Sequence, residues 1–170
     1  MEFPKQIRDI VFKLLQEPTL DNFRDFMKGQ TGEHNTIDFK SEWYEPQKLV
    51  KEMLSIANSG GGVIVFGVHE NDDKTFSYDG INAIKDKTAI SNDVKNYISS
   101  DLKYEVYDFV YNSSEYEELK DHQYQMMIIE DTPQFLPFMS KKKVVIWKRI
   151  EFMYVEEHRV KKQIKKKLQE

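Results

Sequence analysis

The chain has 170 residues, is 39% hydrophobic and 32% charged, and carries a formal net charge of −4. This is enough chain for a globular domain with a proper core. The absence of cysteine excludes disulfides, thiolate metal sites and cysteine nucleophiles. No segment approaches the ~20 consecutive apolar residues of a membrane span, so we expect no membrane segment and a cytoplasmic protein.

The first predicted elements are two helices and a strand. Apolar residues at helical spacing predict a helix over Pro4–Gln16, and a second, short helix follows over Leu20–Lys28. After a polar loop at Gly29–His34, residues Thr36–Lys40 alternate strictly between polar and apolar side chains. That alternation predicts a half-buried strand with Asp38 and Lys40 on its polar face.

The strongest helical pattern runs over Pro46–Asn58, with proline near the first turn and an apolar stripe along one side. Three glycines, Gly60, Gly61 and Gly62, then predict a tight turn from helix to strand, because glycine accepts a left-handed conformation. The apolar run Val63–Val68 predicts a strand buried on both faces. The polar segment that follows, His69–Asp79, is predicted to be turn-like.

The second half mixes helices and strands without a regular βαβ repeat. We expect a helix over Ile84–Asp101, a hairpin from strands Tyr104–Tyr111 and Gln123–Ile129, and a further strand over Val144–Lys148. A charged helix over Glu151–Gln169 ends the chain. The predicted fold class is therefore α+β, with a mixed or antiparallel sheet and flanking helices.

The average charge hides an asymmetry. Residues 101–131 carry nine acids and two lysines, whereas residues 159–170 carry six bases and one acid. The net negative charge argues against a general affinity for nucleic acid. A basic segment can still steer an anionic partner, although a solvated helix end is an equally simple interpretation.

Three motifs resemble one known family. Residues 33–40 read E-H-N-T-I-D-F-K, the helix ends in A-N-S-G-G-G, and the strand ends in F-G-V. These resemble the Schlafen/AlbA-type nucleic-acid-binding domain, with its pattern E-x4-E-F-K, A-N-[ST]-x-G-G and [FI]-G-V. The resemblance implies a Schlafen/AlbA-like domain over 32–150. The helical patterns on either side predict an N-terminal helical extension over 1–31, which lies outside the resemblance, and a basic C-terminal helix over 151–170.

The resemblance also implies an acidic site. Relatives that cut tRNA and rRNA use three acids, which correspond here to Glu33, Asp38 and Glu70. Aspartate at position 38 is one methylene shorter than the usual glutamate. Carboxylates meeting at one edge suit Mg²⁺ or Mn²⁺, which activate a phosphodiester for hydrolysis. Lys40 would neutralise a phosphate on the same face. The alternative is that all four side chains are ordinary surface charges.

Aromatic and basic residues suggest further contacts with nucleic acid. Trp43 follows the Asp38–Lys40 strand, and Lys148 and Arg149 follow Trp147. An aromatic ring beside cations can stack an unpaired base, although burial in the core is the other interpretation. Within the resemblance, Arg149 occupies the place of a family arginine on a late strand.

The sequence thus leaves three functions open. The first is a metal-dependent endoribonuclease acting on structured RNA such as tRNA. The second is a non-catalytic regulatory module that binds DNA or RNA. The third is a nucleotide-binding domain that uses the turn at Gly60, Gly61 and Gly62, although the sequence lacks the lysine and the following helix of a phosphate-binding loop. The expected partner is RNA rather than duplex DNA, and the N-terminal helices could mediate a homodimer.

Overall fold

A computed structural model describes residues 13–14, 16–17, 19–28, 37–73, 75–112 and 119–141. Within these ranges three helices and six strands have defined bounds. The helices are α2 (Leu20–Lys28), α3 (Pro46–Ala57) and α4 (Lys87–Val94), and a 3-10 turn covers Pro133–Phe135. The strands are β1 (Ile37–Lys40), β2 (Gly62–Phe66), β3 (His69–Glu70), β4 (Phe76–Ser77), β5 (Tyr104–Val110) and β6 (Gln123–Ile129).

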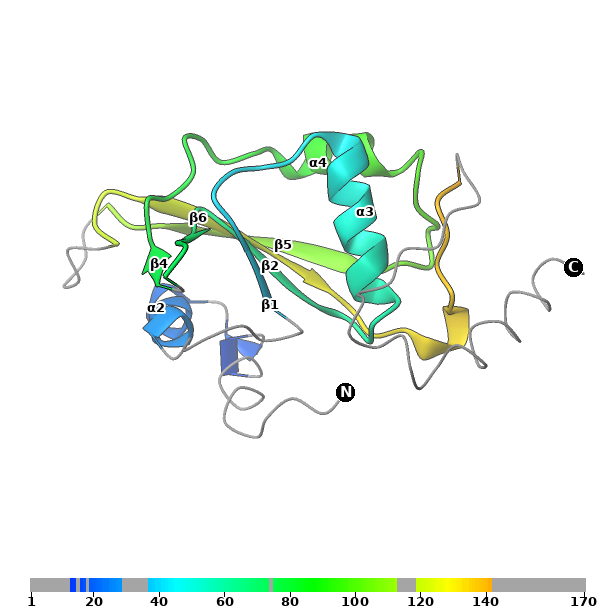
Figure 1. Ribbon diagram of the computed structural model, residues 1–170, viewed down its shortest axis with the longest axis horizontal. Coiled ribbons are helices and arrows are strands. Elements are labelled where there is room, and N and C mark those ends of the chain that lie inside the picture. The colour runs from blue at the N-terminus through cyan, green and yellow to red at the C-terminus, as the bar shows by residue number, and fades with distance from the viewer. Residues whose placement is uncertain are drawn as a thin grey trace, which may run out of the picture. The chain divides into compact units, whose positions relative to one another are not determined.

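Four strands form a mixed sheet in the order β1-β2-β6-β5 (Figure 1). β1 and β2 are parallel, with Ile37 opposite Val63 and Lys40 opposite Phe66. β3 and β4 form a separate antiparallel pair. The predicted α+β class is confirmed. No helix among the described residues is long and apolar enough to cross a membrane.

Most of the predicted elements agree with the structure. α2 and β6 have the predicted bounds, α3 and β5 differ from theirs by one residue, and β1 covers all the described residues of its predicted strand. Every residue of β2 is buried, as the continuous apolar run predicts. Of the predicted helix Pro4–Gln16, only residues 13, 14 and 16 are described, and they are helical. The predicted strand Val144–Lys148 and helix Glu151–Gln169 lie outside the described residues.

Two local predictions were wrong. The segment His69–Asp79 contains the hairpin β3–β4, whose two-residue strands are too short to show a periodic pattern. The predicted helix Ile84–Asp101 is shorter in the structure, where α4 begins after Asp86 and ends at Val94. The Asp86 carboxylate accepts a hydrogen bond from the Ala89 N–H and so caps the helix. Serine, asparagine and aspartate in its last turns disfavour a longer helix.

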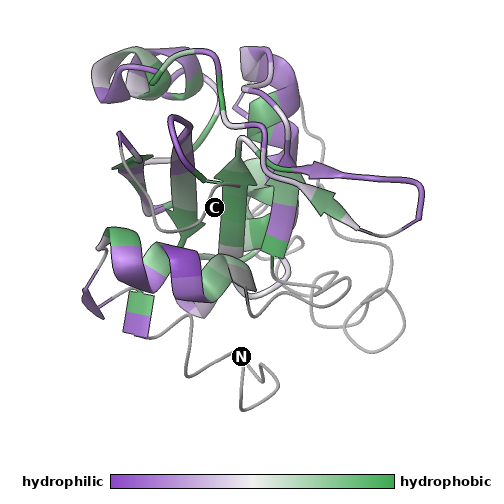
Figure 2. Ribbon diagram, turned by 90° about the vertical axis from the view of Figure 1, so that its left-hand side faces the viewer, coloured by the Kyte–Doolittle hydropathy of each residue, from purple (hydrophilic) through white to green (hydrophobic). Residues whose placement is uncertain are grey.

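The chain divides into two compact units. Unit 1 comprises Met1–Trp43, Val63–Ile84 and Val106–Met127, and unit 2 comprises Tyr44–Gly62, Lys85–Glu105 and Ile128–Glu170. In the core of unit 1, Phe23 of α2 stacks on Phe109 of β5 with ring centroids 4.0 Å apart, and it also contacts Tyr124 of β6. Figure 2 shows the hydrophobic colour mainly on the central strands, and both colours along the helices.

In unit 2, α3 packs beside α4 (Figure 1). The buried side of α3 contains the predicted apolar stripe, and α4 contributes Ile90 and Val94. Asn58 follows α3 and is itself buried. Its amide donates to the Phe138 carbonyl and accepts from the Phe138 N–H, so one side chain fixes the segment that follows β6.

Candidate nucleic-acid interface

An ion pair lies on the polar side of β1. Lys40 Nζ is 2.7 Å from Asp38 Oδ1, and the two side chains are only 20% and 14% exposed. The alternation predicted from the sequence accounts for this geometry, because residues two apart on a strand point to the same face. A pair this far removed from water is held more strongly than an exposed one, since each charge needs its partner to offset its lost hydration.

The chain leaving β2 runs next to the end of β1. The Lys40 carbonyl accepts hydrogen bonds from the N–H groups of Gly67 and Val68, at 2.7 and 3.1 Å. Gly67 has a φ of +101°, a left-handed conformation that favours glycine. These two bonds hold the start of β3 beside the last residue of β1, so the segment bearing Glu70 begins next to Lys40.

Glu70 is half-buried on β3 and lies opposite Phe76 of β4. The Phe76 ring packs against Phe39 of β1, with centroids 4.7 Å apart. The neighbouring His69 is exposed and lies opposite Ser77. The structure therefore places Asp38, Lys40 and Glu70 on neighbouring strands of unit 1, and Phe39 and Phe76 secure the hairpin to β1.

Three of the other predicted site residues, Glu33, Lys148 and Arg149, fall outside the described ranges. Within the part of the chain that is described, no three histidine, aspartate or glutamate side chains are grouped closely enough to hold a metal ion. The proposed metal ligands Asp38 and Glu70 would therefore need Glu33 to complete a triad.

Trp43 is half-buried and belongs to a hydrogen-bonded chain that crosses unit 1. Its ring stacks on Phe66 at 3.8 Å, and its Nε1–H donates to Gln125 Oε1 at 2.8 Å. Gln125 Nε2 in turn donates to Asp108 Oδ1 at 2.8 Å. One face of the indole and its only polar group thus already have partners in the fold.

The sequence did not predict Gln125 or Asp108 as part of this site. Gln125 is fully buried, and a glutamine inside the apolar strand Tyr124–Ile129 was a signal that it has a polar partner. Its partner Trp43 is 82 residues away in sequence, which no periodic pattern can reveal.

The glycine turn in unit 2 has a structural explanation. Gly60 and Gly61 have φ values of +97° and +78°. A Cβ atom on Gly61 would lie 2.7 Å from both the Asp131 nitrogen and the Ile129 oxygen, closer than such atoms can approach. The Gly61 N–H donates to the Ile56 carbonyl, which closes the end of α3. The tight turn predicted from the sequence is therefore needed for backbone packing.

Comparison with known proteins identifies the family. The family model described as Schlafen, AlbA_2 matches residues 33–166. The chain belongs to the Schlafen AlbA_2 family. The resemblance predicted from the three sequence motifs is thereby confirmed, and no curated protein matches the chain.

Family membership suggests that this Schlafen AlbA_2 domain has a nucleic-acid-related role. The matched range contains the Asp38–Lys40 pair, Glu70, Trp43 and the glycine turn. Of these, the ion pair and Glu70 carry the chemistry that a polyanion requires. A lysine can contact a phosphate, and carboxylates can hold the cations that accompany it.

Proposed function

We propose that this Schlafen AlbA_2 domain binds RNA at β1 and β3 and cleaves it with the aid of Mg²⁺ or Mn²⁺. The observation that carries the proposal is the Asp38–Lys40 ion pair, in which both side chains are largely removed from water. A charged pair in such a place costs hydration energy, and a binding or catalytic role is a common reason for it.

The donors suit a hard divalent cation. Carboxylate oxygens are the ligands that Mg²⁺ and Mn²⁺ prefer. Asp38, Glu70 and Glu33 would together supply these oxygens. When bound there, the cation would polarise the phosphodiester and activate the attacking water or hydroxyl. Asp38 has a further role in the proposal, because its carboxylate holds the Lys40 ammonium in position at 2.7 Å.

Lys40 would act on the substrate by charge. Its ammonium lies 2.7 Å from Asp38 Oδ1, and its positive charge would attract a phosphate oxygen brought to the same face. Because the ammonium is fixed before the substrate binds, it needs little rearrangement to stabilise the negative charge that develops in the transition state.

Cleavage of a structured RNA such as tRNA tests the proposal. We expect Mn²⁺-dependent cleavage by the wild type and a loss of about a hundredfold or more in Glu33→Ala, Asp38→Asn and Lys40→Gln. The matched control is Asp93→Asn, since Asp93 forms an ion pair of the same 2.7 Å length with Lys85 in unit 2. Cleavage that persists in Asp38→Asn or in the presence of a chelator would contradict the catalytic proposal.

A second function, a non-catalytic binding module, is favoured by the fact that Asp38 already has a cationic partner. In that case the protein leaves RNA intact, and Lys40 contributes one phosphate contact. Lys40→Gln should then weaken binding equally for all sequences and reduce the slope of log affinity against log salt by about one. A titration with RNA and with duplex DNA over a range of salt concentrations measures both effects.

The third function, nucleotide binding at the glycine turn, has less support, because the close backbone packing at Gly61 already accounts for that glycine. Titration with ATP at millimolar concentration is the corresponding test. An affinity that is lost in Gly60→Ala, where a Cβ atom would have no described residue within 4 Å, would support nucleotide binding at this turn.

A further inference from the structure

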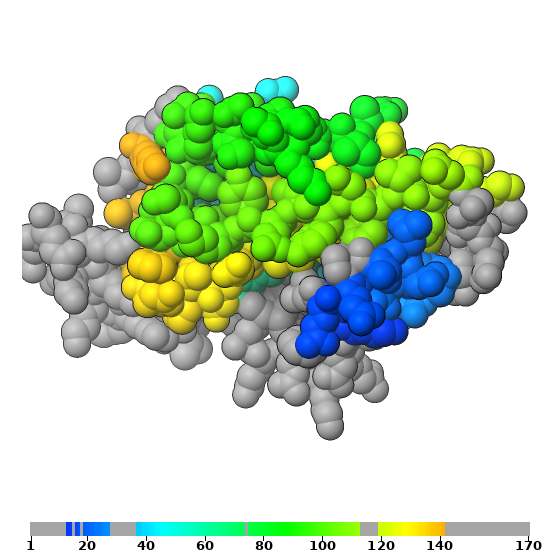
Figure 3. Space-filling model, turned by 180° about the vertical axis from the view of Figure 1, so that it is seen from behind, coloured from blue at the N-terminus to red at the C-terminus, as the bar shows by residue number. Residues whose placement is uncertain are grey.

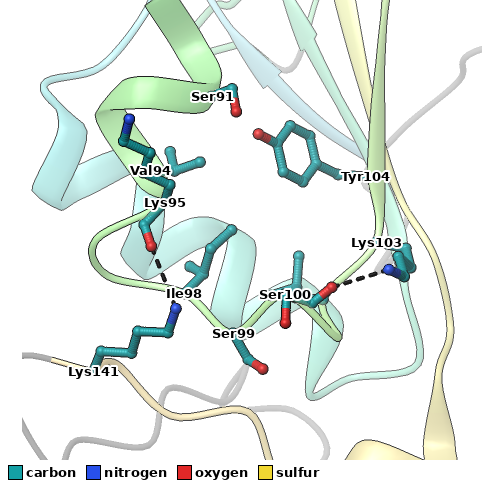
Figure 4. A pocket seen from close by; sticks show the side chains of 10 residues that line it. Ser91, Val94, Lys95, Ile98, Ser99, Ser100, Lys103, Tyr104 and Lys141 are labelled. Carbon is teal, nitrogen blue, oxygen red and sulfur yellow. Dashed lines mark hydrogen bonds between the residues drawn. The ribbon is translucent and has the colours of Figure 1, made fainter. Parts of the chain in front are cut away.

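A cleft of about 540 Å³ lies entirely within unit 2, between the end of α4, the start of β5 and residue 141 (Figure 4). In Figure 3 these parts of unit 2 lie on the same face, with α4 and the following segment in green and residues near 141 in orange. The volume is within the usual range for small-molecule sites, about 300–1,000 Å³.

The polar groups that line the cleft are hydroxyls and ammoniums. Ser91, Ser99, Ser100 and Tyr104 supply hydroxyls, and Lys95, Lys103 and Lys141 supply positive charge. Figure 4 shows the hydroxyl ends of Tyr104 and Ser91 directed toward each other across the cleft. No carboxylate is among the described residues that line it. The lining is therefore cationic and rich in donors, which suits an anion with several oxygen atoms.

Two of the ammoniums are held at the rim. Lys103 Nζ donates to the Ser100 carbonyl at 3.0 Å, and Lys141 Nζ donates to the Lys95 carbonyl at 3.4 Å. Each bond uses one of three donors, so both groups keep donors for a ligand. The one carboxylate in the adjoining loop, Asp101, accepts from the Ser99 hydroxyl.

The remaining lining is apolar. Val94, Ile98 and Leu102 contribute side chains to the cleft although each residue is at most 5% exposed. The Tyr104 ring, at the start of β5, adds an aromatic surface. The cleft thus combines an apolar floor with a cationic rim. A phosphate alone would use only the rim, whereas a phosphate attached to a sugar and a flat base would use both.

We propose that this cleft binds a nucleoside monophosphate group, either as the free nucleotide or as the phosphorylated end of a nucleic-acid strand. Lys103 and Lys141 hold the phosphate, the hydroxyls of Ser91 and Tyr104 bind the sugar or the base edge, and the apolar floor contacts the base. The site lies wholly in unit 2, whereas Asp38, Lys40 and Glu70 belong to unit 1. It is independent of the proposed RNA cleavage.

Calorimetric titration of the whole chain tests this site with AMP, adenosine, inorganic phosphate and O-phosphoserine. We expect AMP to bind at least about tenfold more tightly than each of the other three, because only AMP engages both the rim and the floor. Lys103→Gln and Lys141→Gln should each weaken AMP binding about tenfold, which is the effect expected from the loss of one charged hydrogen bond. Tyr104→Phe should weaken it less, since one neutral hydrogen bond is lost.

The matched control is Lys87→Gln, because Lys87 is an exposed lysine at the start of α4 that does not line the cleft. A circular dichroism spectrum for each variant verifies the fold. Two short oligonucleotides, one with and one without a 5′-phosphate, distinguish a phosphorylated strand end from a free nucleotide as the ligand. A preference for the phosphorylated oligonucleotide over AMP assigns the strand end, and the reverse assigns the free nucleotide.

Three results would overturn the proposal. The first is no AMP binding at 10 mM. That concentration is well above a Kd of about 1 mM, a weak affinity that corresponds to a binding free energy of roughly −4 kcal/mol. The second is AMP affinity that is unchanged in the Lys103→Gln, Lys141→Gln double variant. The third is O-phosphoserine binding as tightly as AMP, which would assign the cleft to phosphorylated protein instead. None of these results depends on whether the protein cleaves RNA.

Discussion

Replacing Gly61 by alanine should destabilise the protein much more than the same change at Gly60. Both glycines have positive φ values, so alanine at either position lowers the free energy of unfolding by about 1–2 kcal/mol, because its backbone is left-handed. Only at Gly61 does the new Cβ meet backbone atoms, the Asp131 nitrogen and the Ile129 oxygen, each at 2.7 Å. No atom of the described residues lies within 4 Å of a Cβ on Gly60.

The difference between the two variants isolates the packing effect. Backbone atoms cannot swing away as the end of a flexible side chain can, and overpacking of this kind costs about 1–3 kcal/mol. We therefore expect a loss of about 1–2 kcal/mol in Gly60→Ala and about 2–5 kcal/mol in Gly61→Ala. For a chain of this size, each kcal/mol lowers the melting temperature by about 2–4 °C.

Urea unfolding followed by circular dichroism measures both free energies of unfolding. The comparison is valid if the two variants and the wild type unfold with the same dependence on urea. Equal losses at the two positions would refute the reasoning, because they would mean that the backbone at 129–131 yields to the added methyl group without cost.

Two further predictions concern buried polar groups in unit 1. Burial raises the pKa of Tyr111 above its usual value of 10, while its hydroxyl donates to the Leu20 carbonyl at 2.6 Å. The unfolded chain releases this proton first, so the contribution to stability is complete below about pH 10 and is lost as the pH rises toward the higher folded value. Tyr111→Phe should lower the free energy of unfolding by about 0.5–1.5 kcal/mol at pH 8. In urea unfolding it should also flatten the loss of stability between pH 9.5 and 11. An unchanged pH profile would contradict the raised pKa of Tyr111. Gln125→Leu should cost about 1–3 kcal/mol, because the Trp43 N–H and the Asp108 carboxylate each lose the hydrogen bond to Gln125. Urea unfolding followed by tryptophan fluorescence measures this loss, and wild-type stability in that variant would show that the hydrogen-bonded chain does not support the fold.

Local patterns in the sequence were sufficient to predict most of the described elements. The alternation over Thr36–Lys40, the stripe of α3 and the apolar run of β2 each reflect a period that the backbone imposes on neighbouring residues. The same alternation predicts that Asp38 and Lys40 lie on one face. The motifs around these elements also identified the family, which the match over residues 33–166 confirms.

Elements that depend on distant contacts could not be predicted in this way. The hairpin β3–β4 consists of two-residue strands, which are too short to show a period, and Phe39 of another strand packs on it. The end of α4 at Val94 was missed for a related reason. Ile98 continues the apolar spacing and is buried, although it lies beyond the helix.

The sequence by itself therefore determined the fold class, the family and which face of β1 is charged, because these properties depend on residues close together in the chain. Only the tertiary structure decided how those charges are arranged. It showed that Asp38 and Lys40 are paired and mostly removed from water, and that the Trp43 N–H is bonded to a glutamine 82 residues away. It also formed a cationic cleft from α4, β5 and Lys141. Burial and long-range partners depend on how the chain folds back on itself, and no local period encodes them.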